Sequence, residues 1–340
     1  MVASSKLVPA PIFYGKRAWP GGPSIQQNWS LPDSMIFYIA KNPSSSKVYQ
    51  NLVQTCKFFF ERNPIIIIAI MDALGDGTKF HISQNEHFEC ITHNCIIIDL
   101  NKLSTKIWIT QGLYIQNRMQ NSIETIIQKN FRFEKLRLVV EDNDIIFDDL
   151  KVLVSFAKSV TLCENNSIKY KNGTIVMLDK ILGCLSTNIE FFFVNFGEDV
   201  SVVNANASTM KNTLKLQNLE NLKSLYLLKC PDTLNVEDLS AFIKKFEDTF
   251  IHLHFASNIS QEYKEQLDSL IDTIIESDVP YHFIEYDGQD EEKLKIMNSR
   301  RFAYEDRDDE SDEDDVDALE NNDGFDVDNE PDVDETEPDA

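Results

Sequence analysis

Residues 31–64 carry more large apolar side chains than a small helical unit can bury by itself. The segment reads LPDSMIFYIAKNPSSSKVYQNLVQTCKFFFERNP, and its pattern predicts three short helices. Leu31-Pro32 opens the first helix, and Asn42-Pro43 ends it because the residue before a proline disfavours helical backbone. Three helices of this length make only a small interior, so we expect some of these side chains to face the rest of the chain or a partner.

The second helix of this segment has one apolar face. Tyr49, Leu52, Val53 and Cys56 follow the i, i+3, i+4, i+7 spacing of one helix face, and Phe59 prolongs the stripe. Such a surplus of apolar side chains indicates a docking module. A helical cap on the following domain is the alternative.

The order Leu-Pro, apolar helix, break, second helix, Cys-Lys-aromatic-aromatic and Asn-Pro resembles the F-box. The resemblance covers about 35 of the 340 residues. The matching positions are Leu31, Pro32, Ile36, Ile39, Leu52, Val53, Cys56, Lys57, Phe58 and Phe59. Asn42-Pro43-Ser44-Ser45 stands where the family usually has Leu-Pro-x-x-Asp, and Phe replaces the usual Trp near the end. These departures look like those of the divergent F-box families expanded in nematodes.

In the F-box family the helical trio binds the Skp-type adaptor of cullin-based ubiquitin ligases. The resemblance therefore implies a set of adaptor-binding residues in this chain: Leu31, Pro32, Ile36, Ile39, Leu52, Val53, Cys56 and Phe59.

Charge is distributed unevenly along the chain. The formal net charge is −24, and residues 305–340 alone hold 20 acidic residues and one basic residue. We expect this acidic tail to be disordered, and the Pro- and Gly-rich residues 1–28 to form a flexible arm. The sequence therefore divides into four parts: a flexible arm at 1–28, an F-box-like helical module that includes the isoleucine run at 29–72, a leucine-rich-repeat-like α/β domain at 73–304 and the acidic tail at 305–340.

A leucine-rich pattern organises the α/β domain. LENLKSLYLLKC, residues 219–230, matches L-x-x-L-x-x-L-x-L-x-x-C and resembles the strand segment of leucine-rich repeats. FEKLRLVVE, AKSVTLCEN (which offers Asn165) and TFIHLHFA repeat its core, while CIIIDL and KIWITQGLYI are expected to be the first strands. Aligning Leu136, Val160, Phe191, Leu225, Ile251 and Phe283 gives spacings of 24, 31, 34, 26 and 32 residues.

Segments whose apolar residues are spaced to share one helix face lie between these strands, and the longest of them spans residues 260–278. The fold class we predict is α/β, with an F-box-like helical trio followed by an irregular leucine-rich-repeat-like βα solenoid. An open α/β domain with a parallel sheet would produce the same alternation and is the alternative. No G-x-G-x-x-G turn opens any of the helices, which weakens a nucleotide-binding interpretation.

Strand alternation assigns side chains to the two faces of the predicted sheet. Leu225, Leu227, Ile251 and Leu253 are expected to point inward, toward the helices. The side chains between them point outward, where Arg and aromatic residues are suited to protein recognition. The target-binding candidates on this outer face are Arg137, Tyr226, His252 and His254.

Catalytic and metal-binding motifs are nearly absent from the sequence. There is no G-x-x-x-x-G-K-[ST], H-E-x-x-H or G-x-S-x-G, so we expect neither an enzyme nor a cofactor. The cluster His87, Cys90, His93 and Cys95 is too closely spaced for the usual two-pair zinc site, so no metal site is predicted.

Other partner classes are disfavoured by the sequence. Clustered Lys and Arg are scarce, which argues against nucleic acid. The longest apolar run, Ile65 to Met71, is seven residues against the ~20 that span a bilayer, and the first residues lack the apolar core of a signal peptide. We expect no membrane partner and a location in the cytoplasm or nucleus.

Two functions from different classes follow. The first is a substrate receptor that links an unknown target protein to a Skp-cullin ubiquitin ligase. The second is a protein-binding repeat domain outside any ligase, whose acidic tail binds basic partners such as histones, as in the acidic leucine-rich nuclear phosphoproteins that it resembles in this respect.

Overall fold

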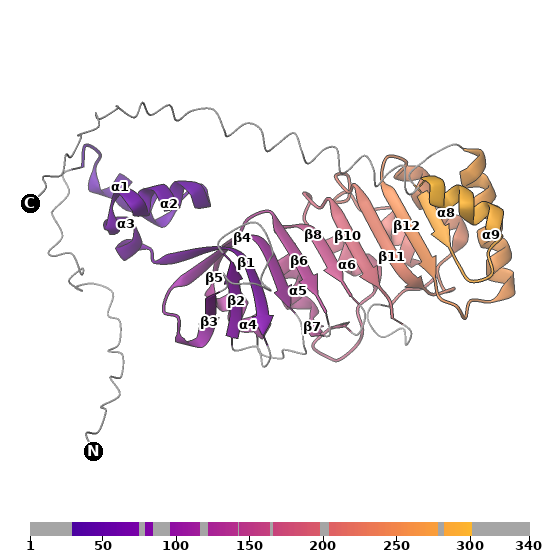
Figure 1. Cartoon of the computed structure of the whole chain (residues 1–340), viewed down its shortest axis with the longest axis horizontal. Helices are drawn as coiled ribbons and strands as arrows, with labels where there is room; N and C mark the ends of the chain where they lie inside the picture. The colour runs from indigo at the N-terminus through magenta and orange to yellow at the C-terminus, as the bar shows by residue number, and fades with distance from the viewer. Residues whose placement is uncertain are drawn as a thin grey trace, which may run out of the picture.

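The chain folds as an α/β structure built on one mostly parallel sheet, with a helical trio at one end (Figure 1). The computed structural model describes residues 29–74, 79–83, 96–115, 122–141, 143–163, 166–197, 204–277 and 282–300. The arm predicted at 1–28 and the tail predicted at 305–340 lie outside the described residues.

The strands of the main sheet, of which the longest described have ten residues each, are rich in β-branched and aromatic residues. They are β1 (Ile65–Leu74), β2 (Lys79–Ser83), β3 (Ile96–Asp99), β4 (Lys106–Ile115), β5 (Asn130–Phe133), β6 (Leu136–Val140), β8 (Ala157–Leu162), β10 (Phe191–Asn195), β11 (Ser224–Cys230), β12 (Phe250–Phe255) and β13 (His282–Glu285). Within the described residues they form an 11-stranded sheet of order β13-β12-β11-β10-β8-β6-β4-β1-β2-β3, with β5 beside β4. Strands β7 (Asp144–Ile146) and β9 (Ser167–Lys169) form a separate parallel pair.

Strand direction and strand order are regular from β4 to β13. Every pair along this stretch is parallel, and β1 is parallel to β4, whereas β1-β2 and β2-β3 are antiparallel. The strands from β4 onward lie side by side in chain order (Figure 1). In this part of the structure the order therefore does not reverse, as it does at the ligand crevice of doubly wound sheets.

The described helices, several of which begin at a capping side chain, are mostly short. They are α1 (Asp33–Lys41), α2 (Ser46–Thr55), α3 (Lys57–Arg62), the 3₁₀ turn η1 (Leu100–Lys102), α4 (Ser122–Lys129), α5 (Phe147–Val154), α6 (Leu178–Cys184), α7 (Thr209–Thr213), α8 (Val236–Lys245), α9 (Gln261–Glu276) and a helical segment at 291–300. Ser45, Asn235 and Ser260 each accept a backbone N–H at the first turn of α2, α8 and α9. The stripe predicted for the longest helix is confirmed, since Tyr263 and Leu267 of α9 are buried.

One face of the sheet packs against the helices. Leu138, Val160, Phe192, Leu225 and Ile251 occupy matching positions on neighbouring strands and are fully buried in one core with the helices. At about 25 cal/mol per Å² of apolar surface, burial of these rows is the main stabilising term of the sheet.

This register corrects the alignment drawn from the sequence. Leu136 pairs with Ala157, so Leu138 is the true counterpart of Val160. Phe191 and Phe283 lie on the face away from α5 to α9, because Phe192 and Ile284 take the positions in register with Leu225 and Leu253. The run Phe191–Phe193 and its neighbours offer apolar residues to both faces, so alternation alone could not choose between them.

The isoleucine run does not belong to the helical module at 29–72. Residues Ile65–Leu74 form β1, which pairs with β4 and enters the sheet before the strands expected to be first. Short apolar runs of β-branched residues are ambiguous in sequence, and pairing with β4 decides this one. The helical module therefore ends at α3.

Buried asparagines close the loops that follow β6 and β8. Asn166 accepts the backbone N–H of Asn143 (2.8 Å) and donates to the carbonyls of Val140 and Cys163 (both 2.7 Å). Asn143 in turn donates to the carbonyls of Ile115 (3.3 Å) and Glu141 (2.6 Å). The buried asparagine described after β8 is thus Asn166, whereas Asn165, which the repeat pattern predicted, lies outside the described residues.

Candidate functional site

The helical trio has a small apolar interior of its own. Ile36 and Ala40 of α1 and Phe59 of α3 are buried, and the Trp29 ring lies 5.7 Å from that of Phe59. Two predicted adaptor contacts, Ile36 and Phe59, are therefore structural residues. Ile39, Leu52, Val53 and Cys56, also predicted as contacts, are half-buried against the same interior.

The outer surface of the trio is nevertheless apolar. On α1, Met35 is 50% exposed and Tyr38 is 67% exposed, while Leu31, Phe37 and Val48 are also exposed. Met35 and Tyr38 are three residues apart, on the side of the helix away from Ile36 and Ala40. Leu31 and Pro32, predicted as adaptor contacts, lie exposed at the start of α1. The trio thus leaves five large apolar side chains exposed, and we call the pair on one side of α1, Met35 and Tyr38, the α1 patch. The F-box pattern singled out neither of the two.

A buried tyrosine joins the trio to the sheet. The Tyr49 hydroxyl donates to the carbonyl of Asn63 (2.5 Å) and accepts the backbone N–H of Ile65 (3.1 Å), the first residue of β1. The Asn63 side chain donates to the carbonyl of Ala40 (3.1 Å) at the end of α1. Burial raises the pKa of Tyr49 above its ordinary value, so the hydroxyl keeps its proton.

Trp108 and Arg132 complete this junction. The Trp108 ring on β4 is fully buried, with the Tyr49 and Phe131 rings 6.4 and 5.3 Å away. The Arg132 guanidinium lies 4.8 Å from the Trp108 ring centroid and donates to the carbonyls of Pro43 (3.2 Å) and Ser44 (3.1 Å), in the link between α1 and α2. These contacts orient the α1 patch relative to the sheet.

Tyr49→Phe should lower the free energy of unfolding by about 1–3 kcal/mol, because it leaves the Asn63 carbonyl and the Ile65 N–H buried without their partner. Urea denaturation followed by circular dichroism measures the change. Tyr38→Phe is the matched control and should have no effect, since Tyr38 is exposed. Equal effects of the two substitutions would contradict the role of the Tyr49 hydroxyl.

The second candidate surface is the face of the sheet away from α5 to α9, which we call the open face. It carries residues in two rows along neighbouring strands: Arg137, Ser159, Phe191, Ser224 and Phe250, then Val139, Thr161, Phe193, Tyr226, His252 and Phe283. Tyr226 is at the centre of an aromatic group, with the Phe191 and Phe250 rings each 5.3 Å away. Toward β6 and β8 the open face is lined by small and aliphatic side chains, apart from the exposed Arg137.

The predicted target-binding residues share this face, but they differ in accessibility. Tyr226 and His254 are half-buried, so part of each side chain remains exposed. His252 is only 5% exposed, because its ring lies 4.7 Å from Phe283 and its Nε2 lies 3.2 Å from the Glu285 carboxylate. His252 therefore lies on the predicted face but is buried by its neighbours, and its role in target binding stays a prediction.

Other kinds of site are not seen among the described residues. Those residues contain no group of three or more His, Cys, Asp or Glu side chains arranged to hold a metal ion. His87, Cys90, His93 and Cys95 lie outside them. Within the same residues, no helix combines the length and apolar character that crossing a bilayer requires.

Tyr49, Trp108 and Arg132 thus join the trio to the sheet that carries the open face. Toward β12 and β13 that face is buried, since Phe250 and Phe283 are each 1% exposed. Comparison of the chain with protein-family models and with curated protein sequences finds no match.

Proposed function

We propose that this chain is a substrate receptor that links a target protein to a Skp-cullin ubiquitin ligase in the cytoplasm or nucleus. The helical trio binds the Skp-type adaptor and the open face binds the target, while ubiquitin transfer is left to other subunits. The observation that carries the proposal is the α1 patch. Met35 and Tyr38 stay exposed although the trio has an interior to which Ile36, Ile39 and Ala40 of α1 contribute.

The domain that presents the target surface is, in this proposal, a leucine-rich-repeat-like solenoid. The parallel strands in chain order support it, as does the pattern Leu225-x-Leu227-x-x-Cys230. The Cys230 thiol donates to the Leu227 carbonyl (3.3 Å), and the side chain of Asn143 bonds similarly after Leu138-x-Val140. In leucine-rich repeats this Asn or Cys position closes each turn.

Co-purification of the full chain with a recombinant Skp-type adaptor tests the proposal, with affinity measured by calorimetry. Met35→Glu/Tyr38→Glu should weaken binding at least about 100-fold, because it places two charges in the apolar contact. Leu31→Ala/Pro32→Ala should also weaken adaptor binding. The melting temperature should stay unchanged for the first pair, since both side chains are exposed.

Val152→Glu/Ile296→Glu is the matched control, because these side chains are also large, apolar and exposed but lie far from the trio along the chain. This variant should bind the adaptor like the unmodified chain. Absence of adaptor binding by the unmodified chain, or equal losses in both pairs, would overturn the proposal. Binding to histones in place of the adaptor would favour a non-ligase protein whose acidic tail holds basic partners.

A further inference from the structure

Basic side chains gather where the parallel strands begin. Lys106 is the first residue of β4, Lys135 directly precedes β6, and Lys223 directly precedes β11. We call this side of the sheet the basic edge. It carries the cations Lys106, Arg132, Lys135, Arg137, Lys158 and Lys223 and the carboxylates Glu134, Glu190, Glu247 and Asp248. The six cations outnumber the four carboxylates, and the positive excess lies between β4 and β11, because Glu247 and Asp248 precede β12.

Part of this charge is not neutralised locally. Lys158 and Lys223 share Glu190, with Lys223 at 3.1 Å, and the hydrogen bond from Lys158 holds the pKa of Glu190 below its ordinary value. One carboxylate between two ammonium groups leaves a net positive charge. Lys135 and Arg137 are both exposed, and neither has an ion-pair partner among the described residues.

The opposite edge of the sheet lacks this excess of positive charge. Glu141, Asp232 and Asp287 follow β6, β11 and β13, whereas the cations described beside them are Lys229, at the end of β11, and Lys264, which donates to the Asp287 carbonyl (2.6 Å). The two ends of the strands therefore differ in charge. An anionic segment of the same chain would be attracted more strongly to the basic edge than to the opposite edge.

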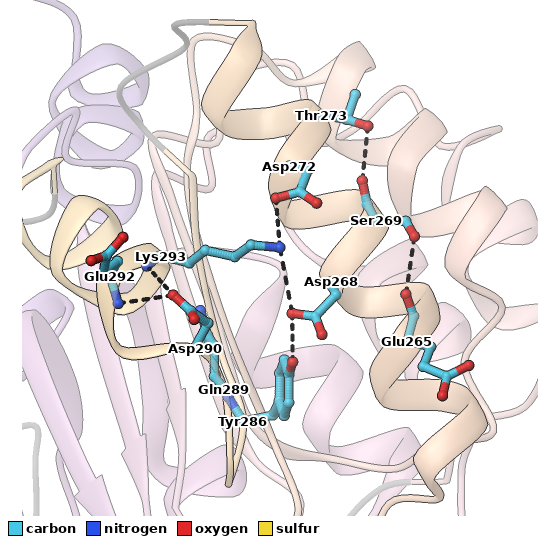
Figure 2. Close-up of polar contacts among 10 residues, drawn as sticks. All are labelled: Glu265, Asp268, Ser269, Asp272, Thr273, Tyr286, Gln289, Asp290, Glu292 and Lys293. Carbon is cyan, nitrogen blue, oxygen red and sulfur yellow. Dashed lines mark hydrogen bonds and ion pairs between the residues drawn. The ribbon is translucent and has the colours of Figure 1, made fainter.

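The described chain also ends at the basic edge. Figure 2 shows Lys293 of the helical segment 291–300 reaching Asp272 of α9, at 2.6 Å, beside Asp268, which accepts the Tyr286 hydroxyl at 2.7 Å. Farther along, Arg300 donates to the carbonyls of Ile274 and Ile275 (both 3.1 Å), near the end of α9 that leads into β13. Because α9 ends where β13 starts, the chain leaves the structure on the strand-start side.

From these observations we propose that the acidic segment 305–340 docks on the basic edge of its own sheet. This segment carries 20 acidic residues and one basic residue. Its 36 residues can extend over about 120 Å, whereas the five strand spacings from β13 to β6 amount to about 24 Å. Tethering keeps the segment at millimolar effective concentration, so weak individual ion pairs suffice for docking.

The docked segment contacts Lys135 and Arg137, which lie at the start of β6. The contact depends on exposed charges, so it weakens as salt shortens the Debye length from about 8 Å at 0.15 M to about 3 Å at 1 M. The inference does not rest on adaptor binding and stands or falls independently of it.

Carbodiimide cross-linking of the full chain, read by mass spectrometry, tests the proposal. The reagent joins a lysine amine to a carboxylate in contact with it, with loss of water. We expect links from Lys106, Lys135, Lys158 and Lys223 to residues 305–340 in the monomer at low salt, and yields at least about fivefold lower in 1 M NaCl.

Charge reversal at the two unpaired cations sharpens the test. Lys135→Glu/Arg137→Glu should lower the yield of links from Lys106, Lys158 and Lys223 to the tail at least about threefold, because like charges then repel it. Lys171→Glu/Lys180→Glu changes exposed lysines away from the basic edge and should leave the yield unchanged. Equal melting temperatures of the two variants confirm that both fold.

Absence of tail links in the monomer at low salt would overturn the proposal. Links found only in the cross-linked dimer would also overturn it, and would assign the edge to the tail of a second copy. Tail links that are as frequent from Lys171 and Lys180 as from the basic edge would show adventitious contact and reject a defined docking surface.

Discussion

Replacing Trp108 with alanine should lower the free energy of unfolding by about 3–5 kcal/mol, the largest effect that we expect from a single substitution in the junction. The ring is fully buried between Tyr49, Phe131 and Arg132, so its removal leaves a cavity and ends the cation–π contact at 4.8 Å. Chemical denaturation measures the loss. Adaptor affinity per folded molecule should change little, because the α1 patch is elsewhere.

Trp108→Phe tests whether the Trp108 side chain stabilises the junction by its packing or by a hydrogen bond of its indole N–H. The indole N–H of Trp108 has no hydrogen-bond partner within the described residues, so its removal leaves no acceptor unpaired there. We expect a cost of about 1–2 kcal/mol, from lost contact area alone. If phenylalanine costs as much as alanine, the Trp108 side chain stabilises the junction through a polar contact rather than through packing.

Asn166→Ala should cost about 2–3 kcal/mol, because it removes three hydrogen bonds of a mostly buried loop. The side chain accepts the N–H of Asn143 and donates to the carbonyls of Val140 and Cys163, all at 2.7–2.8 Å, and of these groups the Val140 carbonyl keeps a second bond, from the Cys163 N–H (2.9 Å). Hydrogen exchange should also show faster exchange of the Asn143 amide, since that amide loses its acceptor.

Asn221→Ala is the matched control for this prediction. Its side chain donates to the Thr187 carbonyl at 2.8 Å, but the contact is exposed, so water can replace it. We expect a cost below about 1 kcal/mol. Similar costs at Asn166 and Asn221 would show that the buried loop after β8 does not depend on its asparagine.

Helical stripes were well predicted from the sequence, because their spacing is a local property. The stripe of α9 contains Tyr263, Leu267 and Ile271, all of which are buried as expected. Leu225 and Leu227 also face the core as alternation predicted, with Tyr226 between them on the other face. In each case one face is apolar and the other polar or half-exposed, so the pattern has a single solution.

The remaining features depended on distant partners. Phe191 to Phe193 offers an apolar side chain at every position, so only pairing with β8 and β11 sets its register. His252 was assigned to the correct face, but Phe283 and Glu285, which cover it, come from a later strand. For Tyr49, the helical stripe predicted burial but could not reveal Trp108 as the surface on which it packs.

The exposure of the α1 patch also could not be predicted from the sequence. Met35 and Tyr38 are apolar or aromatic residues in an apolar helix, and the sequence alone does not say which of its side chains the trio buries. Ile36 and Ala40 take the interior, because Phe59 and Trp29 meet them there. Exposure of the others is a property of the assembled helices and becomes visible only in the structure.

The chain-ordered strands have a consequence for biosynthesis. From β6 to β13 each strand of the main sheet pairs with the one that preceded it in translation, so a nascent chain always finds its template already outside the ribosome. The sheet can then lengthen vectorially, with no need to wait for the last residues. The last described segment, 291–300, then packs back on α9 through Lys293 and Arg300, so a chain cut short before residue 291 would lack these contacts while its strands could already be paired.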